Sequence, residues 1–328
     1  MSERASKSQR FQLGYESSYG GGATVNRRLM GLTLDVDPQV TRRRNMAQGY
    51  NFASSTTMER DFTEGDLGGA LVFDELHHLF SLALGTVTPT SLTPATAQQW
   101  VWNLPNSGDI TPKSAKIEKG DTVTAEAFLG GVLSDLDLSW NREGFDVGGT
   151  VIGQQLDVAA TLTTTGVTTM PQIALDPGKI GVFIDNTSAG LGGTRMLRAF
   201  DGGLSISGLF GQIWPLNELK TSFDGVISLA PDAEQTITLA ANAAGKALIT
   251  SLRAGDRRFL RWRVLGPQIG VGPATYLLQI DTAIEVVDVD SFEDSDGIYA
   301  IPLTFSPVAD ETWGKAGVIT VVNTQTAY

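Results

Sequence analysis

The stretch that decides the fold runs from Lys116 to Gly153 and reads KIEKGDTVTAEAFLGGVLSDLDLSWNREGFDVGGTVIG. Apolar and polar side chains alternate before residue 140, and the alternation resumes after residue 145. A period of two is typical of a strand with one buried and one wet face. The apolar positions are Leu136, Leu138 and Trp140 on the first strand, and Phe145, Val147 and Val151 on the second.

The opposite side of both strands is mostly polar. It carries Asp135, Asp137 and Ser139, then Asp146, Gly148, Thr150 and Ile152. Residues 141–144 (Asn-Arg-Glu-Gly) supply the turn between the strands, and Gly144 is free to adopt a positive φ there. We therefore expect a hairpin with a regular polar face. Such a face suits a water-filled channel or a large interface better than an enzyme pocket.

The composition is that of a β-rich chain whose charge is acidic. The 328 residues include 37 glycines and are 41% hydrophobic, enough for a packed core, many tight turns and two modest domains. With 36 acidic against 24 basic residues, the net charge is −12. Tight nucleic-acid binding is not expected, because phosphate contacts require Lys and Arg. An acidic surface that repels DNA, and so lets it slide, fits this balance.

Several functional classes find no support in the sequence. There is no cysteine, and therefore no disulfide or thiolate metal site. Residues 1–10 lack the apolar core of a secretory signal, and no stretch approaches the roughly 18 apolar residues of a membrane span. His77 and His78 are the two histidines, and no nucleophile–His–acid set is visible. We expect no enzyme and no cofactor, although a pair of carboxylates acting as a glycosidase is neither favoured nor excluded.

Two helices are predicted, one in each half of the chain. The first covers about 71–84, with Val72, Phe73, Leu76, Leu79, Phe80 and Ala83 on its buried face and Asp74, His78 and Ser81 opposite. Adjacent histidines cannot share a metal in the i, i+4 manner, so we expect both to be solvated or interfacial. The second helix covers about 241–254, with Ala244, Leu248, Ile249 and Leu252 inward and Gly255 at its end.

The order of helix, strand and polar-faced hairpin occurs twice, which suggests an internal duplication. In the second half, Gln279, Asp281 and Glu285 take the polar positions of a strand over residues 276–287. The predicted domains are therefore residues 1–175 and 176–328. The first begins with an arm over residues 1–22.

Two charged groups permit more than one interpretation. Seven acidic residues and no Lys or Arg lie between Asp281 and Gly297, but Asp288, Asp290, Asp294 and Asp296 miss the spacing of an EF-hand loop. Repulsion of a polyanion, or pairing with a neighbour's arginines, is favoured over a calcium site. For basic residues in a predicted loop over 41–57, a solvated run or contact with a carboxylate-rich neighbour is favoured over a nucleic-acid contact. For basic residues on one later strand face, ion pairs between subunits are favoured over a nucleic-acid groove. The basic residues are Arg42, Arg43 and Arg44, and Arg257, Arg261 and Arg263.

Four segments, in this order, resemble the major tail proteins, or tail tube proteins, of bacteriophages with long non-contractile tails. Leu13–Gly20 resembles their opening G-x-E-x-x-Y/F-G segment, and Phe73–Gly85 is similar to a helix that packs beneath their sheet. Lys116–Gly153 resembles their central hairpin, and Ala316–Asn323 a terminal strand that often ends in Asn. The four segments together span most of the chain, and none is diagnostic alone.

The resemblance implies a mainly β subunit, a β-sandwich or barrel-like tail-tube fold with flanking helices. Polar-faced hairpins of several subunits would join into one continuous barrel around the DNA channel, and rings would stack into the tail. Because the chain is long for one tube domain, a duplicated domain assembling as a trimeric, pseudo-hexameric ring is expected, with a true hexamer as the alternative. The implied location is the virion tail, assembled in the cytoplasm of the bacterial host.

The resemblance also implies roles for particular residues and partners. The residues expected to face the channel are Asp135, Asp137, Gln279, Asp281 and Glu285. The residues expected to contact neighbouring subunits or rings are Tyr15, Glu16, Tyr19, Arg42, Arg43, Arg44, Arg257, Arg261 and Arg263. The arm over 1–22 and the loop over 41–57 would become ordered on the adjacent ring. Further partners would be the tape measure, tail terminator and distal tail proteins, with double-stranded DNA passing without specific binding.

Two other functions compete with this one. A β-rich receptor- or carbohydrate-binding tail protein would expose aromatic side chains such as Trp100 and Trp102 at a concave site. An acidic-site glycosidase would lose its turnover when a single carboxylate is replaced.

Overall fold

The computed structural model of the chain describes residues 8–216, 221–295 and 297–328, and within them the protein is mainly β, as the composition predicts. Two α-helices are present, α1 (Leu76–Leu84) and α2 (Ala243–Ala254). The strands are β1 (Arg10–Tyr15), β2 (Arg27–Leu29), β3 (Leu32–Asn45), β4 (Ser55–Ala70), β5 (Thr90–Ser91), β6 (Gln98–Pro105), β7 (Ala115–Gly120), β8 (Ala125–Trp140), β9 (Phe145–Gly153), β10 (Thr168–Thr169), β11 (Ile180–Asp185), β12 (Arg195–Met196), β13 (Ala199–Ser207), β14 (Phe210–Ile213), β15 (Gly225–Ser228), β16 (Asp232–Ala240), β17 (Arg258–Gln268), β18 (Thr275–Val289), β19 (Glu293–Ser295), β20 (Ile298–Pro307) and β21 (Lys315–Asn323).

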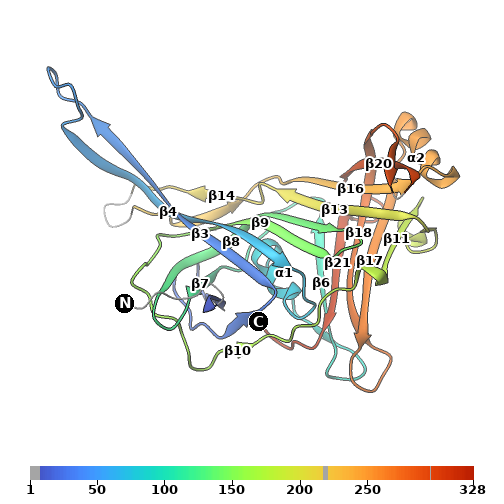
Figure 1. Cartoon of the computed structure of the whole chain (residues 1–328), viewed down its shortest axis with the longest axis horizontal. Helices are drawn as coiled ribbons and strands as arrows, with labels where there is room; N and C mark the ends of the chain where they lie inside the picture. Colours follow the sequence, from blue (N-terminus) through green and yellow to red (C-terminus); the bar gives the residue numbers. More distant parts are fainter. Residues whose placement is uncertain (1–7, 217–220, 296) are drawn as a thin grey trace.

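Most strands belong to one bent antiparallel sheet. Its first part runs in the order β3, β4, β9, β8, β13, β16 and β20, and forms the upper layer in Figure 1. Strand β20 also pairs with β18, which carries β17 and β11 along one edge and β21 and β6 along the other. These later strands run steeply downward in Figure 1, so the sheet turns a corner.

The hairpin predicted from Lys116–Gly153 is confirmed in its main features. Strands β8 and β9 pair from Trp140↔Phe145 onward, and the six predicted apolar side chains are all buried. The turn differs in one detail, because Gly144 does not adopt a positive φ. Instead, Oδ1 of Asn141 accepts hydrogen bonds from the backbone N–H groups of Glu143 and Gly144. Ile152 is also buried, whereas we expected it on the polar side.

Helix α1 lies inside the bend of the sheet. It begins at Leu76, later than predicted, and every residue from Leu76 to Ala83 is buried. The expectation of a solvated face bearing His78 and Ser81 is therefore wrong. A helix enclosed by strands on several sides has no wet face for its hydrophobic period to mark.

The second helix agrees closely with its prediction. Helix α2 begins after Asn242, whose Oδ1 accepts a hydrogen bond from the N–H of Gly245, and ends at Gly255 in the left-handed conformation. Leu248 is buried, whereas Ala244 is exposed. The helix packs against β18, at the end of the molecule that β20 also reaches (Figure 1).

Part of the predicted N-terminal arm, residues 1–22, is built into the fold. Residues 1–7 lie outside the described residues. Residues 10–15, however, form β1, which is hydrogen-bonded between β2 and β7, and Leu13 is completely buried. The segment is therefore an inner strand, because its alternate apolar side chains reach the core.

The two halves of the chain share the sheet. Strand β8 pairs with β13, and β6 pairs with β21, so hydrogen bonds cross the predicted boundary at residue 175. One cluster of buried apolar side chains likewise includes residues of both halves. The internal duplication stays a prediction.

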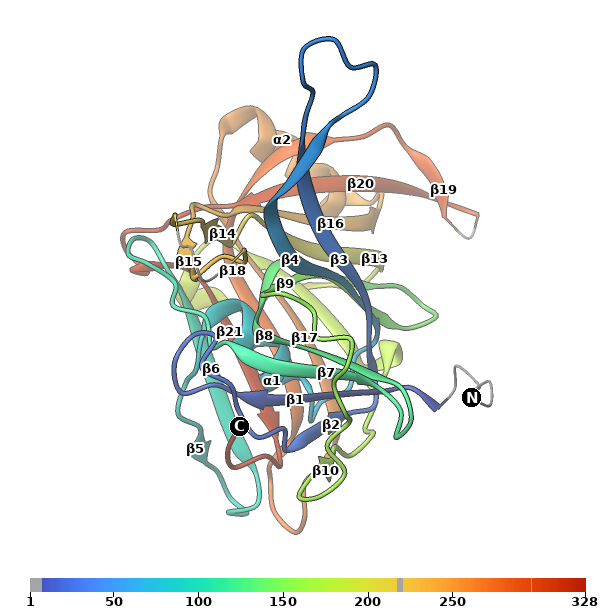
Figure 2. The ribbon, with the colours of Figure 1, turned by 90° about the vertical axis from the view of Figure 1, so that its left-hand side faces the viewer.

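Strands β3 and β4 extend beyond the sheet as a long hairpin. Figures 1 and 2 show it standing away from the rest of the molecule. Residues 41–57 were predicted as a loop, yet β3 continues to Asn45 and β4 starts at Ser55. At the root of the projection, the guanidinium of Arg60 lies 4.9 Å from the centre of the Trp214 ring, which also packs against Phe62.

Candidate functional site: an acidic sheet face

The outward face of the upper layer carries carboxylates on neighbouring strands. Asp137 of β8 lies opposite Gly148 of β9 and Ser205 of β13, and Ser205 lies opposite Glu234 of β16. Opposed residues of antiparallel strands share a face of the sheet. The apolar neighbours of Asp137, Leu136 and Leu138, point inward to the core.

A second row of opposed residues is still more acidic. Asp35 of β3 lies opposite Asp66 of β4, Asp66 opposite Thr150, and Thr150 opposite Asp135. Asp37 and Glu64 form a further pair of like charges. Like charges directly opposite one another destabilise a sheet, so this arrangement weakens the fold that contains it.

We call this surface the acidic face. It comprises Asp35, Asp37, Glu64, Asp66, Asp135, Asp137, Asp146, Asp232 and Glu234. Strands β8, β9, β13 and β16 contain no Lys or Arg, and the side chains between the carboxylates are mostly Gly, Ser and Thr. Within the described part of the chain, the one ion pair to these nine residues joins Lys119 to the exposed Asp35 at 3.1 Å.

Beyond the corner, the same side of the sheet has a different character. Thr236 lies opposite Thr304, and Ser306 lies opposite Glu285, so the acidic face continues onto β18. We call this continuation the paired patch. It comprises Arg257 with Arg261 and Arg263 of β17, and Gln279, Asp281 and Glu285 of β18. The predicted channel-facing residues of both halves thus lie on one side of a single sheet.

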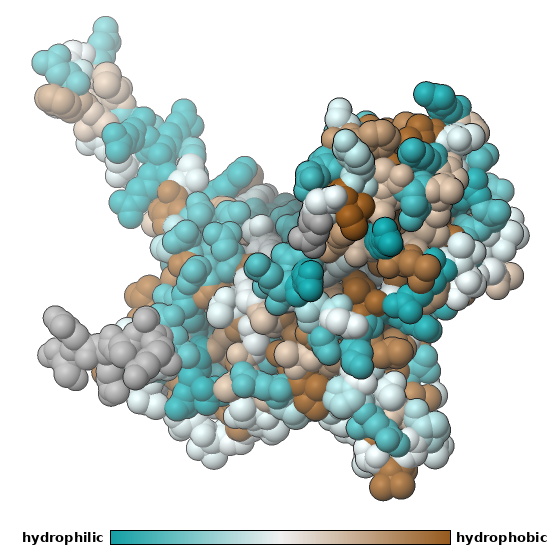
Figure 3. Space-filling model, turned by 45° about the vertical axis from the view of Figure 1, so that its right-hand side comes forward, coloured by the Kyte–Doolittle hydropathy of each residue, from teal (hydrophilic) through white to brown (hydrophobic). Residues whose placement is uncertain are grey.

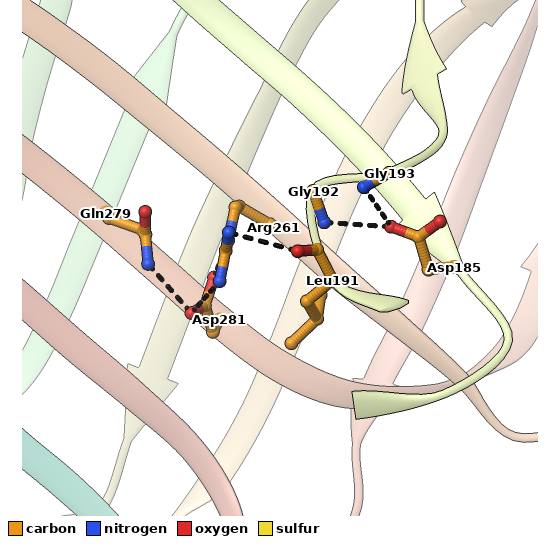
Figure 4. A network of polar contacts seen from close by, with 7 residues as sticks. All are labelled: Asp185, Leu191, Gly192, Gly193, Arg261, Gln279 and Asp281. Carbon is orange, nitrogen blue, oxygen red and sulfur yellow. Dashed lines mark hydrogen bonds and ion pairs between the residues drawn. The ribbon is translucent and has the colours of Figure 1, made fainter. Parts of the chain in front are cut away.

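In the paired patch, the carboxylates are neutralised within the chain. Nε and Nη2 of Arg261 contact the two oxygens of the buried Asp281 at 2.6 and 2.8 Å, and Gln279 donates a further hydrogen bond to Asp281 at 2.9 Å. Figure 4 shows Arg261 between Asp281 and the carbonyl of Leu191, to which it donates at 3.1 Å. Arg261 therefore joins the sheet to the loop after β11.

That loop is held by a second carboxylate. Asp185 accepts hydrogen bonds from the backbone N–H groups of Gly192, Gly193 and Thr194 at 2.9 to 3.2 Å. Figure 4 shows its side chain directed into the loop. The loop can therefore present its Leu191 carbonyl to Arg261 in a fixed position.

The other two arginines of the paired patch also have partners in the chain. Arg257 contacts Asp310 at 3.1 Å and Glu285 at 3.4 Å, and its pKa is raised, mainly by the hydrogen bond to Asp310. The guanidinium of Arg263 lies 5.0 Å from the centre of the Phe183 ring. These contacts do not test the expected contacts between subunits, which stay predictions.

The three residues predicted at subunit contacts near the N-terminus are instead engaged inside the fold. Glu16 is 1% exposed and accepts hydrogen bonds from the N–H groups of Gly20 and Gly130. The hydroxyl of Tyr15 lies 2.9 Å from Nδ1 of His78. Tyr19 packs against Phe223, and burial raises its pKa. Their polar groups face the protein because β1 is an inner strand.

The histidines form a buried aromatic cluster rather than a surface pair. The rings of His77 and His78 are 3.9 Å apart, and His77 stacks on Trp100 at 4.8 Å. Burial lowers the pKa of His77 to about 3, and lowers that of His78 well below its ordinary value. Both side chains are therefore neutral at pH 7.

Sequence reasoning missed the residues that complete this cluster. Asn323 accepts a hydrogen bond from Nε1 of Trp100 at 2.9 Å and donates to the carbonyl of Phe73. Tyr328 packs edge-on against Trp100 and Tyr15. The Asn that ends the last strand was noted as a motif, but its partners lie more than 200 residues away in sequence.

Trp100 and Trp102 are buried, and so do not form the exposed aromatic site that the receptor-binding alternative expects. Their places in β6 point them toward α1, where Trp102 donates a hydrogen bond to the carbonyl of Gly85.

In the described residues, no group of three or more His, Asp or Glu is arranged to hold a metal ion. Asp296, one of the candidate calcium ligands, lies outside those residues. Neither described helix has the length and hydrophobicity that crossing a membrane demands.

The projecting hairpin is the second candidate functional element. Arg42, Arg43 and Arg44 are exposed along it, as predicted for a solvated basic run, although they lie in a strand. Apolar side chains near its end are also exposed, among them Phe52 at 83%. Both faces of this hairpin are solvated, so no core stabilises it. Contact with another surface would bury its exposed apolar side chains and stabilise it.

The comparisons with known proteins found no match, either among models of protein families or among curated proteins.

Proposed function

We propose that this chain is a structural subunit of a phage tail tube, in which rings of subunits stack and the acidic face lines the channel for double-stranded DNA. The observation that carries the proposal is the acidic face itself. Eight of its nine carboxylates have no ion pair in the described part of the chain, and small side chains separate them.

The chemistry of this face fits a conduit better than a binding site. DNA is gripped by Lys and Arg, which displace its counterions, whereas a wall of carboxylates repels it. Short Gly, Ser and Thr side chains leave few features that could hold a passing duplex. The like-charge pairs Asp35–Asp66 and Asp37–Glu64 weaken the sheet, so a role outside the fold accounts for them best.

Open sheet edges support assembly into a larger barrel. Among the described strands, β3 pairs with β4 alone, and β6 has beyond β21 only the two-residue partner β5. Long unpaired edges invite pairing with another chain, and a closed barrel removes them. Pairing of such edges between neighbouring copies would make the sheets continuous around a channel.

The ring is proposed to be a trimer with pseudo-sixfold symmetry, in accordance with the suggested duplication, and a true hexamer is the alternative. The expected partners are the tape measure, tail terminator and distal tail proteins. The location would be the virion tail, after assembly in the cytoplasm of the bacterial host.

Negative-stain electron microscopy of the purified protein tests the proposal, across several concentrations and salt levels and with and without a tail-tip extract as template. We expect hollow tubes or stacked rings, and their averages distinguish threefold from sixfold symmetry. A discrete particle that ignores the template and binds glycans or cell surfaces would refute the proposal in favour of the receptor-binding alternative.

A matched pair of variants tests the role of the acidic face. In tubes of Asp137→Lys/Asp146→Lys, we expect more double-stranded DNA to be retained at low salt than in wild-type tubes, because the wall repels it less and offers lysines to its phosphates. The control is Glu59→Lys/Glu311→Lys, which makes the same charge change away from that face. Equal DNA retention by both variants would count against a channel-lining role.

A further inference from the structure

We infer that the end of the β18–β20 hairpin is the docking surface for the projecting hairpin of a second copy of this chain. The inference rests on the proposed assembly and names the two surfaces that meet. We call the surfaces the tip and the end patch. The tip comprises Arg42, Arg43, Arg44, Met46, Tyr50 and Phe52, and the end patch comprises Val287, Asp288, Asp290, Phe292, Asp294 and Tyr299.

The tip combines positive charge with exposed apolar area. Tyr50 and Met46 are each about two-thirds exposed and Phe52 more so, at 63%, 66% and 83%. Within the described part of the chain, none of its three arginines has an ion pair. Aromatic side chains and arginines are the residues that most often dominate binding at protein interfaces.

The end patch has the complementary character. Phe292 and Tyr299 are 54% and 75% exposed, and Val287 is exposed beside them. Asp288, Asp290 and Asp294 are exposed on the same short hairpin and have no ion pair among the described residues. The nearby cation is Lys246, whose ammonium lies 6.0 Å from the centre of the Phe292 ring.

Two other hollows on the surface fit the tip less well. A groove of about 340 Å³ beside Leu104 and Leu229 has no charged lining residue to pair with the arginines. A groove of about 770 Å³ beside Trp140 is lined by Glu143 and Asp201 as well as Arg142 and Arg198, so it offers the arginines no net attraction. The acidic face has the opposite charge, but small polar side chains in place of exposed aromatic ones. The end patch offers both opposite charge and exposed aromatic area, and so matches the tip best.

The positions of the two surfaces explain why the partner is another copy. In Figure 1, the projecting hairpin leaves one end of the long axis, and β20 with α2 occupies the other. Figure 3 shows the hairpin separated from the remaining surface, so it does not fold back onto its own chain. Two different surfaces at opposite ends make a head-to-tail contact, which repeats into rings or stacks.

Charge reversal and its rescue test the inference. The tip variant is Arg42→Glu/Arg43→Glu/Arg44→Glu, and the end-patch variant is Asp288→Arg/Asp290→Arg/Asp294→Arg. Each alone should raise the concentration needed for assembly by about tenfold or more, as measured by sedimentation. One chain that carries all six substitutions should assemble again, because its reversed tip then meets a reversed end patch on every neighbouring copy.

The matched control is Asp109→Arg/Glu143→Arg/Glu311→Arg, which makes the same three-charge change at exposed positions outside the tip, the end patch and the acidic face, and should assemble like the wild type. Unchanged thermal unfolding of each variant shows that folding is intact, since all the exchanged side chains are exposed. Normal assembly of the end-patch variant, or failure of the six-substitution chain to assemble, would overturn the inference.

Crosslinking separates this inference from the proposed function. The chain has no cysteine, so Phe52→Cys and Tyr299→Cys variants can be mixed and oxidised without competing thiols. We expect a disulfide-linked dimer from the mixture and much less from either variant alone. Tubes that form without this crosslink would refute the docking surface but not the tail-tube function. The crosslink without tubes or rings would support the docking surface and refute the tail-tube function.

Discussion

The acidic face and the paired patch lie on the same side of one sheet, yet they treat their carboxylates in opposite ways. On β17 and β18, Asp281 is buried and held by Nε and Nη2 of the Arg261 guanidinium. On β4 and β8, Asp66 and Asp137 face solvent without a cation. A carboxylate that stabilises the fold acquires a partner, as Asp135 does by accepting a hydrogen bond from the N–H of Gly208. Exposed carboxylates that have no ion pair within the described residues, such as Asp66 and Asp137, point instead to a function outside the fold.

The comparison also shows that an acidic residue at a polar position of a strand can be either exposed to solvent or paired within the fold. Alternation of polar and apolar residues places Asp137 and Asp281 alike on the wet side of a strand. What distinguishes them is the neighbouring strand, since β17 brings Arg261 opposite Asp281, whereas β13 brings Ser205 opposite Asp137. In the proposed tube, channel lining is therefore expected first of the acidic face, whereas the carboxylates of the paired patch form ion pairs within the chain.

The largest effect is expected in the paired patch. Replacing Arg261 with Ala leaves Asp281 buried without its cation and should lower the free energy of unfolding by about 3 kcal/mol. Denaturant titration measures this change. The control, Asp137→Ala on the acidic face, should change stability by less than about 0.5 kcal/mol. A similar loss in both variants would remove the distinction between the two regions.

Acid should lower the stability of the whole fold because of two buried histidines, which lie in neither region. His77 and His78 have lowered pKa values in the folded protein, so below an unfolded value of about 6.5 the unfolded chain binds protons that the folded chain does not. Stability is therefore constant above about pH 7 and falls as the pH decreases through 6 toward 3. Each histidine contributes at most about 1.4 kcal/mol per pH unit.

The variant His78→Asn identifies the source of this acid sensitivity. Its stability should depend less steeply on pH between about 6.5 and 4.5 than that of the wild type, as measured by thermal unfolding. Glu75 acts in the opposite direction, because burial raises its pKa and protonation then favours the folded state. An unchanged slope in the variant would place the acid sensitivity elsewhere.

The smallest effect is expected on the acidic face, and with the opposite sign. Asp66→Asn removes the repulsion from Asp35 and should raise the free energy of unfolding by about 0.5 kcal/mol at low salt. The gain should diminish as salt screens the charges. Glu285→Gln, which removes an exposed ion pair with Arg257, should have no effect or a slight destabilising one. A loss of stability in Asp66→Asn would mean that its carboxylate has a structural role.

Local patterns predicted those parts of the fold that depend on local chemistry. The alternation around Leu136 and Val147 gave the β8–β9 hairpin, and the Gly255 cap gave the end of α2. The burial of His77 could not be read in this way, because the strands that cover it come from distant segments. The arginine run was predicted as a loop because its polar residues give no period, although strand pairing with β4 fixes it.

The candidate site was predictable to the same extent. Asp135 and Asp137 were identified from alternation, and the structure places them on the acidic face. Asp146 was placed on the same polar face of the hairpin. Asp35, Asp66 and Glu234 were not identified, since only the register between strands brings them beside Asp137. A search for acidic residues at alternate positions in predicted strands would have found them.

The most direct test of the central claim is a cryo-electron microscopy reconstruction of the assembled protein. The account predicts a hollow tube in which β8 and β9 face the channel, with Asp137 and Asp146 on its wall. A tube with these carboxylates on its outer surface, or buried between subunits, would contradict it.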